Sequence, residues 1–222
     1  SSAMAFGAGG SLSSGWSIGA TYTQMDIDSY GTEYKDADSS SGGATLLSSS
    51  TQAKNVDVGS VFAEYTGESG HTFGIEWIPG SSSIGSGSRT DTASAGVDTE
   101  ADTGTYTANA EVDNHMTLYV EPTIMFTPNF GVYAKGGVHR MKILTLENLA
   151  VGLSQSDYPD KVVYGGTYGA GIKANHSSGL FMKIEATESV YQKYDEFGAG
   201  GTNRVIADID TTQAAVKIGY NF

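Results

Sequence analysis

The sequence predicts an all-β fold, a transmembrane antiparallel up-and-down β-barrel of eight strands with short turns at one end and long loops at the other. Three observations support this prediction. The 222 residues include 30 glycines and 13 tyrosines, a composition that favours strands and tight bends over helices. No run of about 18 uncharged apolar residues occurs, which excludes a spanning helix and leaves a spanning barrel open. Several segments alternate apolar and polar residues with the period of two that strands have.

The first four strands each present one apolar face. A turn at 66–70 is expected between the second and third strands, and the inner face of the fourth is expected to carry His115, Thr117, Tyr119, Glu121, Thr123 and Met125. The apolar positions are Trp16, Ile18, Ala20 and Tyr22; Val61, Ala63 and Tyr65; Phe73, Ile75 and Trp77; and Val112, Met116, Leu118, Val120, Ile124 and Phe126.

The last four strands follow the same rule, with turns at 127–129 and 175–179. Four longer segments, roughly 28–54, 80–103, 147–160 and 195–204, are rich in Ser, Gly, Thr and Asp and are expected to be loops. The apolar positions are Val132, Ala134, Gly136 and Val138; Val162, Tyr164, Tyr168, Ala170, Ile172 and Ala174; Leu180, Met182, Ile184, Ala186 and Val190; and Thr212, Ala214, Val216, Ile218, Tyr220 and Phe222.

The ending Val216-Lys217-Ile218-Gly219-Tyr220-Asn221-Phe222 carries a family resemblance. It resembles the C-terminal signature of bacterial outer-membrane barrels, in which Val216, Ile218, Tyr220 and Phe222 would be read by the barrel assembly machinery. The whole chain is similar in pattern to the small eight-stranded proteins of this group: the OmpA transmembrane domain, OmpX, OmpW and the opacity proteins. The resemblance implies one outer-membrane domain over 1–222, with 1–14 as an N-terminal extension, short periplasmic turns, long extracellular loops, and lipid and lipopolysaccharide as surroundings.

Eight charged residues are expected to point into the barrel as a lumenal charge network, with Tyr119, Tyr133 and Tyr191 beside them. The four acids and four bases balance, so a lumen filled by paired side chains is the first hypothesis, because eight strands leave little free cross-section. A narrow gated ion path is the alternative. The eight residues are Glu64, Glu76, Glu121, Lys135, Lys173, Lys183, Glu185 and Lys217.

Aromatic residues are expected to form two belts at the membrane interfaces. Ordinary core packing is the competing interpretation. One belt would contain Trp16, Tyr65, Phe73, Phe126, Tyr220 and Phe222, and the other Tyr22, Trp77, Tyr164 and Tyr168.

The net charge of −13, from 25 acids and 12 bases, argues against a nucleic-acid partner, because phosphate binding needs a surplus of Lys and Arg. Cysteine is absent, which rules out disulfides and thiolate metal sites. Asp26, Asp28, Asp36 and Asp38 are weak calcium candidates, but their spacing matches no compact site, and solvated acidic loops are the preferred interpretation.

No catalytic residue and no cofactor are predicted. His176 precedes two serines, a weak echo of a Ser/His hydrolase, but an exposed turn residue is the simpler interpretation. The resemblance to small outer-membrane barrels implies a structural or adhesive surface barrel, which here would display acidic loops, with self-association left open. A small porin-like channel for ions or small solutes is the alternative.

Overall fold

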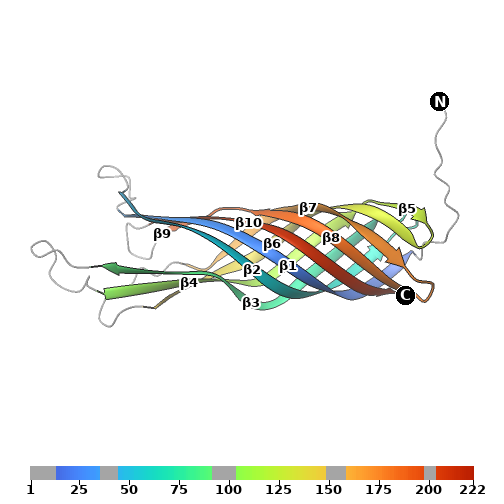
Figure 1. Ribbon diagram of the computed structural model, residues 1–222, viewed down its shortest axis with the longest axis horizontal. Coiled ribbons are helices and arrows are strands. Elements are labelled where there is room, and N and C mark those ends of the chain that lie inside the picture. Colours follow the sequence, from blue (N-terminus) through green and yellow to red (C-terminus); the bar gives the residue numbers. More distant parts are fainter. Residues whose placement is uncertain (1–13, 36–44, 92–103, 149–158, 198–203) are drawn as a thin grey trace, which may run out of the picture.

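The computed structural model describes residues 14–35, 45–91, 104–148, 159–197 and 204–222, and Figure 1 shows them as one closed antiparallel sheet. The ring closes where β1 pairs with β10, with Ser17 opposite Asn221. Within these residues no helix is long and apolar enough to cross a membrane. The strands are β1 (Gly15–Lys35), β2 (Thr45–Thr66), β3 (Thr72–Asp91), β4 (Gly104–Glu121), β5 (Thr123–Thr127), β6 (Phe130–Asn148), β7 (Lys161–Asn175), β8 (Leu180–Tyr191), β9 (Tyr194–Phe197) and β10 (Arg204–Asn221).

These ten elements form a ring of eight barrel strands, as the sequence predicts. Two of the eight are each interrupted and so count as two elements. Pro122 separates β4 from β5, and both pair with β6. A proline has no N–H to donate, so the ladder breaks there although its carbonyl still accepts from the Ala134 N–H at 3.1 Å. Residues 192–193 separate β8 from β9, which both pair with β10. The predicted eight-stranded up-and-down barrel is confirmed.

Three short turns lie at the same end of the barrel as Gly15 and the C-terminus (Figure 1). They connect β2 to β3, β5 to β6 and β7 to β8, at the predicted positions. Gly70 and Gly179 have φ values of 82° and 92°, a region in which glycine lacks the steric penalty of other residues.

The strands continue far into the segments that the sequence assigns to loops. β1 runs to Lys35 and β2 starts at Thr45, so most of 28–54 is strand, and 80–91 belongs to β3. A strand of 21 residues extends roughly 70 Å, or roughly 50 Å along the axis of a barrel whose strands tilt by about 40°. That height is about twice the roughly 25 Å apolar band of outer-membrane barrels.

A bulge in β4 corrects the predicted face of Val112. The register against β6 shifts between Asp113 and Met116, and Asn114 has a φ of 52°, which asparagine tolerates better than most residues. The extra residue reverses the alternation. Met116 therefore lies outside, as predicted, whereas Val112 packs inside against a hydrophobic cluster.

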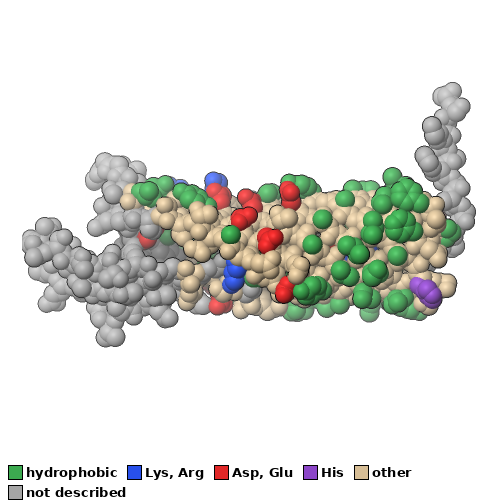
Figure 2. All heavy atoms as spheres, viewed as in Figure 1, with side chains coloured by type: hydrophobic (Ala, Val, Ile, Leu, Met, Phe, Trp, Pro, Cys, Tyr) green, Lys and Arg blue, Asp and Glu red, His purple; other side chains and the backbone are tan. Residues whose placement is uncertain are grey.

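The polarity of both barrel faces reverses along the axis. On β1 the outward residues change from Ile18 and Tyr22 to Asp26 and Asp28, while the inward residues change from serine and threonine to Met25 and Ile27. Figure 2 shows the apolar side chains gathered towards the end that carries the turns. We call the part beyond this reversal the stem: 24–35 of β1, 45–59 of β2, 78–91 of β3, 104–114 of β4, 140–148 of β6, 161–163 of β7, all of β9, and 204–210 of β10.

One wall of the stem is open. β2 and β3 pair over only six residues each, from Thr66 opposite Thr72 to Val61 opposite Trp77. Beyond that point β2 continues beside β1, and β3 beside β4. Pro79, Gly80 with a φ of 83° and two register shifts bend β3 away. We call the gap between 45–60 of β2 and 78–91 of β3 the seam.

Candidate functional site

The outer wall between the turns and the stem is apolar. Its large hydrophobic side chains stay exposed in a band around the barrel, among them Ile18 at 58% and Ile124 at 63% exposure. A soluble barrel would bury such residues. All ten aromatic residues predicted to form belts lie exposed on this outer wall and none belongs to the interior, and their grouping in two belts stays a prediction: Trp16, Tyr22, Tyr65, Phe73, Trp77, Phe126, Tyr164, Tyr168, Tyr220 and Phe222.

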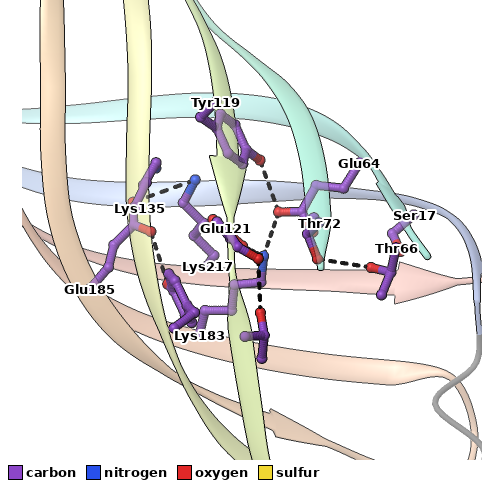
Figure 3. A network of polar contacts seen from close by, with 12 residues as sticks. Ser17, Glu64, Thr66, Thr72, Tyr119, Glu121, Lys135, Lys183, Glu185 and Lys217 are labelled. Carbon is purple, nitrogen blue, oxygen red and sulfur yellow. Dashed lines mark hydrogen bonds and ion pairs between the residues drawn. The ribbon is translucent and has the colours of Figure 1, made fainter. Parts of the chain in front are cut away.

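At the level of this band, the interior contains buried glutamate and lysine side chains that pair with one another. Lys183 is fully buried, and its Nζ lies 2.6 Å from Glu64 Oε1 and 2.5 Å from Glu121 Oε2. The Tyr119 hydroxyl donates a 2.8 Å hydrogen bond to Glu64. We call Lys183, Glu64 and Glu121 the triad. These residues join β8, β2 and β4 across the barrel (Figure 3). One oxygen of each carboxylate, Glu64 Oε2 and Glu121 Oε1, has no hydrogen-bond partner in the described chain.

A second cluster of buried charges lies beside the first. Lys217 Nζ lies 2.5 Å from Glu76 and 3.5 Å from Glu185. Lys135 Nζ lies 2.7 Å from Glu185 and 3.7 Å from Glu76, so the four side chains form a ring of alternating charge. Both lysines also lie over the Tyr119 ring: Lys135 Nζ is 4.4 Å and Lys217 Nζ is 4.8 Å from the ring centroid. Tyr119 thus packs between the two clusters.

Lys173 differs from the other lumenal lysines. It is buried, and in the described chain it forms no ion pair; its Nζ lies 4.8 Å from the centre of the Phe181 ring. Of the tyrosines expected beside the charges, Tyr133 donates to Glu185 at 2.9 Å. Tyr191 instead contacts His115, with 3.1 Å between its hydroxyl and Nε2. The network therefore contains seven of the eight predicted residues in direct ion pairs.

A histidine cluster, which the spacing in the sequence did not reveal, lies on the stem side of these charges. The rings of His115 and His139 are 5.2 Å apart, and His139 stacks on Tyr191 at 4.2 Å. The two histidines come from paired strands, since His139 is opposite Thr117. Register between strands is set by bulges and turns, so the positions of the histidines along the chain do not reveal this neighbourhood.

Within the described residues, two small cavities adjoin the charged interior. One of about 30 Å³ is lined by the histidines together with Glu76, Lys135 and Glu185. The other, about 20 Å³, adjoins Lys173 and the β7–β8 turn. A single ordered water needs roughly 10–15 Å³, so each cavity has room for one or two waters and is too small for a larger solute.

The stem is closed inside by hydrophobic packing. Buried side chains from β1, β6, β7, β9 and β10 form one cluster, with Val56 and Val58 of β2 packed against it. A charged layer and an apolar layer therefore fill the barrel in series. The buried members of the apolar layer are Met25, Ile27, Met141, Ile143, Val163, Tyr194 and Ile209.

The calcium candidates do not assemble within the described residues. Asp26 and Asp28 lie on the outer wall of β1, not in a loop, and Asp26 accepts a 2.7 Å hydrogen bond from the Asn55 amide. Asp36 and Asp38 lie outside the described residues. No group of three metal-binding side chains occurs among the residues that the structure places. His176 is exposed in the β7–β8 turn, and its Nδ1 lies 2.9 Å from Ser178 Oγ.

A closed ring of eight antiparallel strands, with an apolar outer band and a charged interior, defines a small transmembrane β-barrel. The fold is that of the small eight-stranded outer-membrane proteins. OprG from Pseudomonas aeruginosa has a similar structure, with a TM-score of 0.59 and 14% identity over 96% of this chain and 98% of that one. The fold and the apolar band place this chain in the bacterial outer membrane.

Two further solved barrels align with lower scores. Ail, the attachment invasion locus protein of Yersinia pestis, has a TM-score of 0.37 and 12% identity over 90% of this chain and 99% of its own. The outer membrane protease OmpT from Escherichia coli has a TM-score of 0.44 and 8% identity over 94% and 97%. No family model matches the chain, and no curated protein matches it.

Proposed function

We propose that this chain is a surface barrel with a sealed lumen, whose extracellular stem makes the functional contacts. The carrying observation is the filling of the interior in two layers, the charge clusters around Lys183 and Lys217 and the apolar cluster around Met141. An eight-stranded barrel has an interior just wide enough for side chains. Ions crossing this one would have to separate buried ion pairs and then pass an apolar layer.

The stem supports the contact role by its height and its charge. Its outer wall carries acids such as Asp26, Asp57 and Asp210, all exposed. Acidic walls near the membrane surface suit divalent cations that bridge to the anionic headgroups of lipopolysaccharide. Lipopolysaccharide, a second copy of the chain and an assembly role for the C-terminal strand remain predictions within this proposal.

A narrow channel is the second candidate, and the two cavities favour it. They lie on opposite sides of the charge clusters, one beside Glu76 and one beside Lys173. If the pairs around Lys135 and Lys217 separated, water could connect the two. This candidate requires that the ring of alternating charge opens reversibly.

Single-channel conductance in planar bilayers separates the two candidates. The full chain is compared with Lys135→Ala, Glu121→Ala and a control, Glu188→Gln, which removes a charge from the outer wall. The sealed barrel predicts no steady conductance from the native chain or the control. A steady native conductance that Lys135→Ala or Glu121→Ala alters, and Glu188→Gln does not, would establish the channel and overturn the sealed lumen.

A further inference from the structure

The seam leaves a strand edge without a partner. On its β3 side, β2 pairs only from Val61 to Thr66, so 45–60 has no strand neighbour there within the described chain. Every residue from Ser49 to Asn55 is exposed, whichever face it lies on. Unpaired edges offer rows of N–H and C=O groups to an incoming strand. The seam is therefore a surface at which main-chain pairing can continue.

The two edges of the seam differ in how well they can accept a strand. β3 carries Pro79 and two register shifts, features that block edge pairing. β2 has no proline from Thr45 to Thr66, and its register against β1 is regular from Ser49 to Thr66. Among the described side chains, that of Lys54 crosses the gap, and its Nζ donates to the Ser83 carbonyl at 2.6 Å. The accepting edge is therefore that of β2.

The side chains beside this edge define what would fit it. Val56 and Val58 point inward and pack against the apolar cluster of the stem. On the outer wall, Asp57 of β2 lies near Asp26 and Asp28 of β1, which are opposite Asn55 and Ala53. The described outward residues of β1 and β2 in the stem include no Lys or Arg. Cross-strand neighbours of opposite charge, and apolar neighbours on one face, stabilise pairing.

We propose that the seam binds an extended peptide in which apolar and basic residues alternate, added to β2 as a further strand. The apolar side chains lie against Val56 and Val58, and the basic ones lie beside Asp57. A second copy of this chain fits the site poorly, because its net charge of −13 opposes the same acids. This inference rests on the proposed surface-contact function, for which it names the surface and the class of partner.

Hydrogen exchange in the presence of a synthetic peptide tests the proposal. The full chain is placed in phosphatidylcholine nanodiscs, and the probe is a short peptide of alternating valine and lysine. In a strand, successive N–H groups point to opposite sides. Strand addition therefore predicts new protection at alternate amides within 49–59, the ones that do not already face β1. Binding without protection of these amides would overturn the proposal.

Matched controls separate strand addition from simple charge attraction. Asp57→Lys is expected to weaken binding by about tenfold, whereas Glu68→Lys, the same charge change in the β2–β3 turn, should leave it unchanged. A peptide of identical composition with its valines and lysines in two blocks should protect no amides. Equal weakening by both variants would also overturn the proposal. The conductance experiment is independent of this one. A conducting barrel would overturn the sealed-lumen proposal, but it would not decide whether a peptide strand adds to β2.

Discussion

Lys183 and Glu64 lie 119 positions apart in the chain, yet their side chains meet at 2.6 Å in the centre of the barrel. Neither side chain is accessible to solvent. A buried charge is stable only beside its partner, because desolvation costs several kcal/mol per ion. The pair therefore fixes β2 against β8 across the lumen, although β1 and β10 lie between these two strands in the ring.

Lys183→Met is expected to destabilise the barrel by about 3–5 kcal/mol, because Glu64 and Glu121 would remain buried without their counter-ion. Urea unfolding in lipid vesicles, followed by tryptophan fluorescence, measures the loss. Glu121→Gln is the matched control, and it should cost less, because it removes a carboxylate from a site with two acids and one base. Equal losses would contradict this account of the triad.

The two tryptophans of the chain should report the two edges of the apolar band. Trp16 lies at the end with the turns and Trp77 at the start of the stem. In Trp77→Phe and in Trp16→Phe, the remaining tryptophan should be quenched most by lipids brominated near the headgroup. Stronger quenching by lipids brominated at the chain ends would place that residue near the bilayer centre and refute the belts.

Met141→Ala should loosen the stem without loosening the membrane section. Met141 is 2% exposed inside the apolar cluster, and such truncations cost about 2–5 kcal/mol. Hydrogen exchange should rise in the stem amides of β6 and β10. Met182→Ala, which removes the same atoms from the lipid-facing wall, should leave stem exchange unchanged. Similar effects of the two variants would argue against an apolar core in the stem.

A pH effect is expected where β9 meets β10. Arg204 donates to both oxygens of Asp195, at 2.6 Å and 2.5 Å, and this hydrogen bonding holds the pKa of Asp195 below its usual value. The pair thus stabilises β9 at pH values above about 3.9, the pKa of aspartate in the unfolded chain. That stability is lost as the pH falls through the lower folded pKa. Carboxyl NMR should show the pKa of Asp195 rising towards its usual value in Arg204→Gln, and an unchanged titration would rule out this cause.

The sequence was sufficient for the ring because alternation and turns act locally. The faces of Tyr22 and Lys217 follow from their parity alone, and the turns at 66–70 and 175–179 follow from glycine and small polar residues. The eight inward charges could be named in the same way. The partner of each charge could not be predicted from the sequence, because contacts such as that of Lys183 with Glu64 depend on the register across the whole ring.

Three features escaped prediction for separate physical reasons. Val112 changes face because the bulge at Asn114 adds one residue, and a bulge leaves little trace in a hydrophobic pattern. The sequence predicts a loop at Asp26 and Asp28, which lie in β1, because acids on an outer wall do not resemble a membrane strand. The seam depends on where β3 leaves β2, and the Pro79-Gly80 pair marks a bend there without giving its direction.

The reversal of polarity between Tyr22 and Asp26 has a consequence for the vertical position of the barrel. Sinking by a few residues would bring the carboxylates of Asp26, Asp57 and Asp210 into contact with acyl chains, and rising would expose the ring of Trp16 to water. Both displacements are unfavourable. The protein is therefore held at one immersion depth, and anything that binds its outer end does so at a constant distance from the lipid.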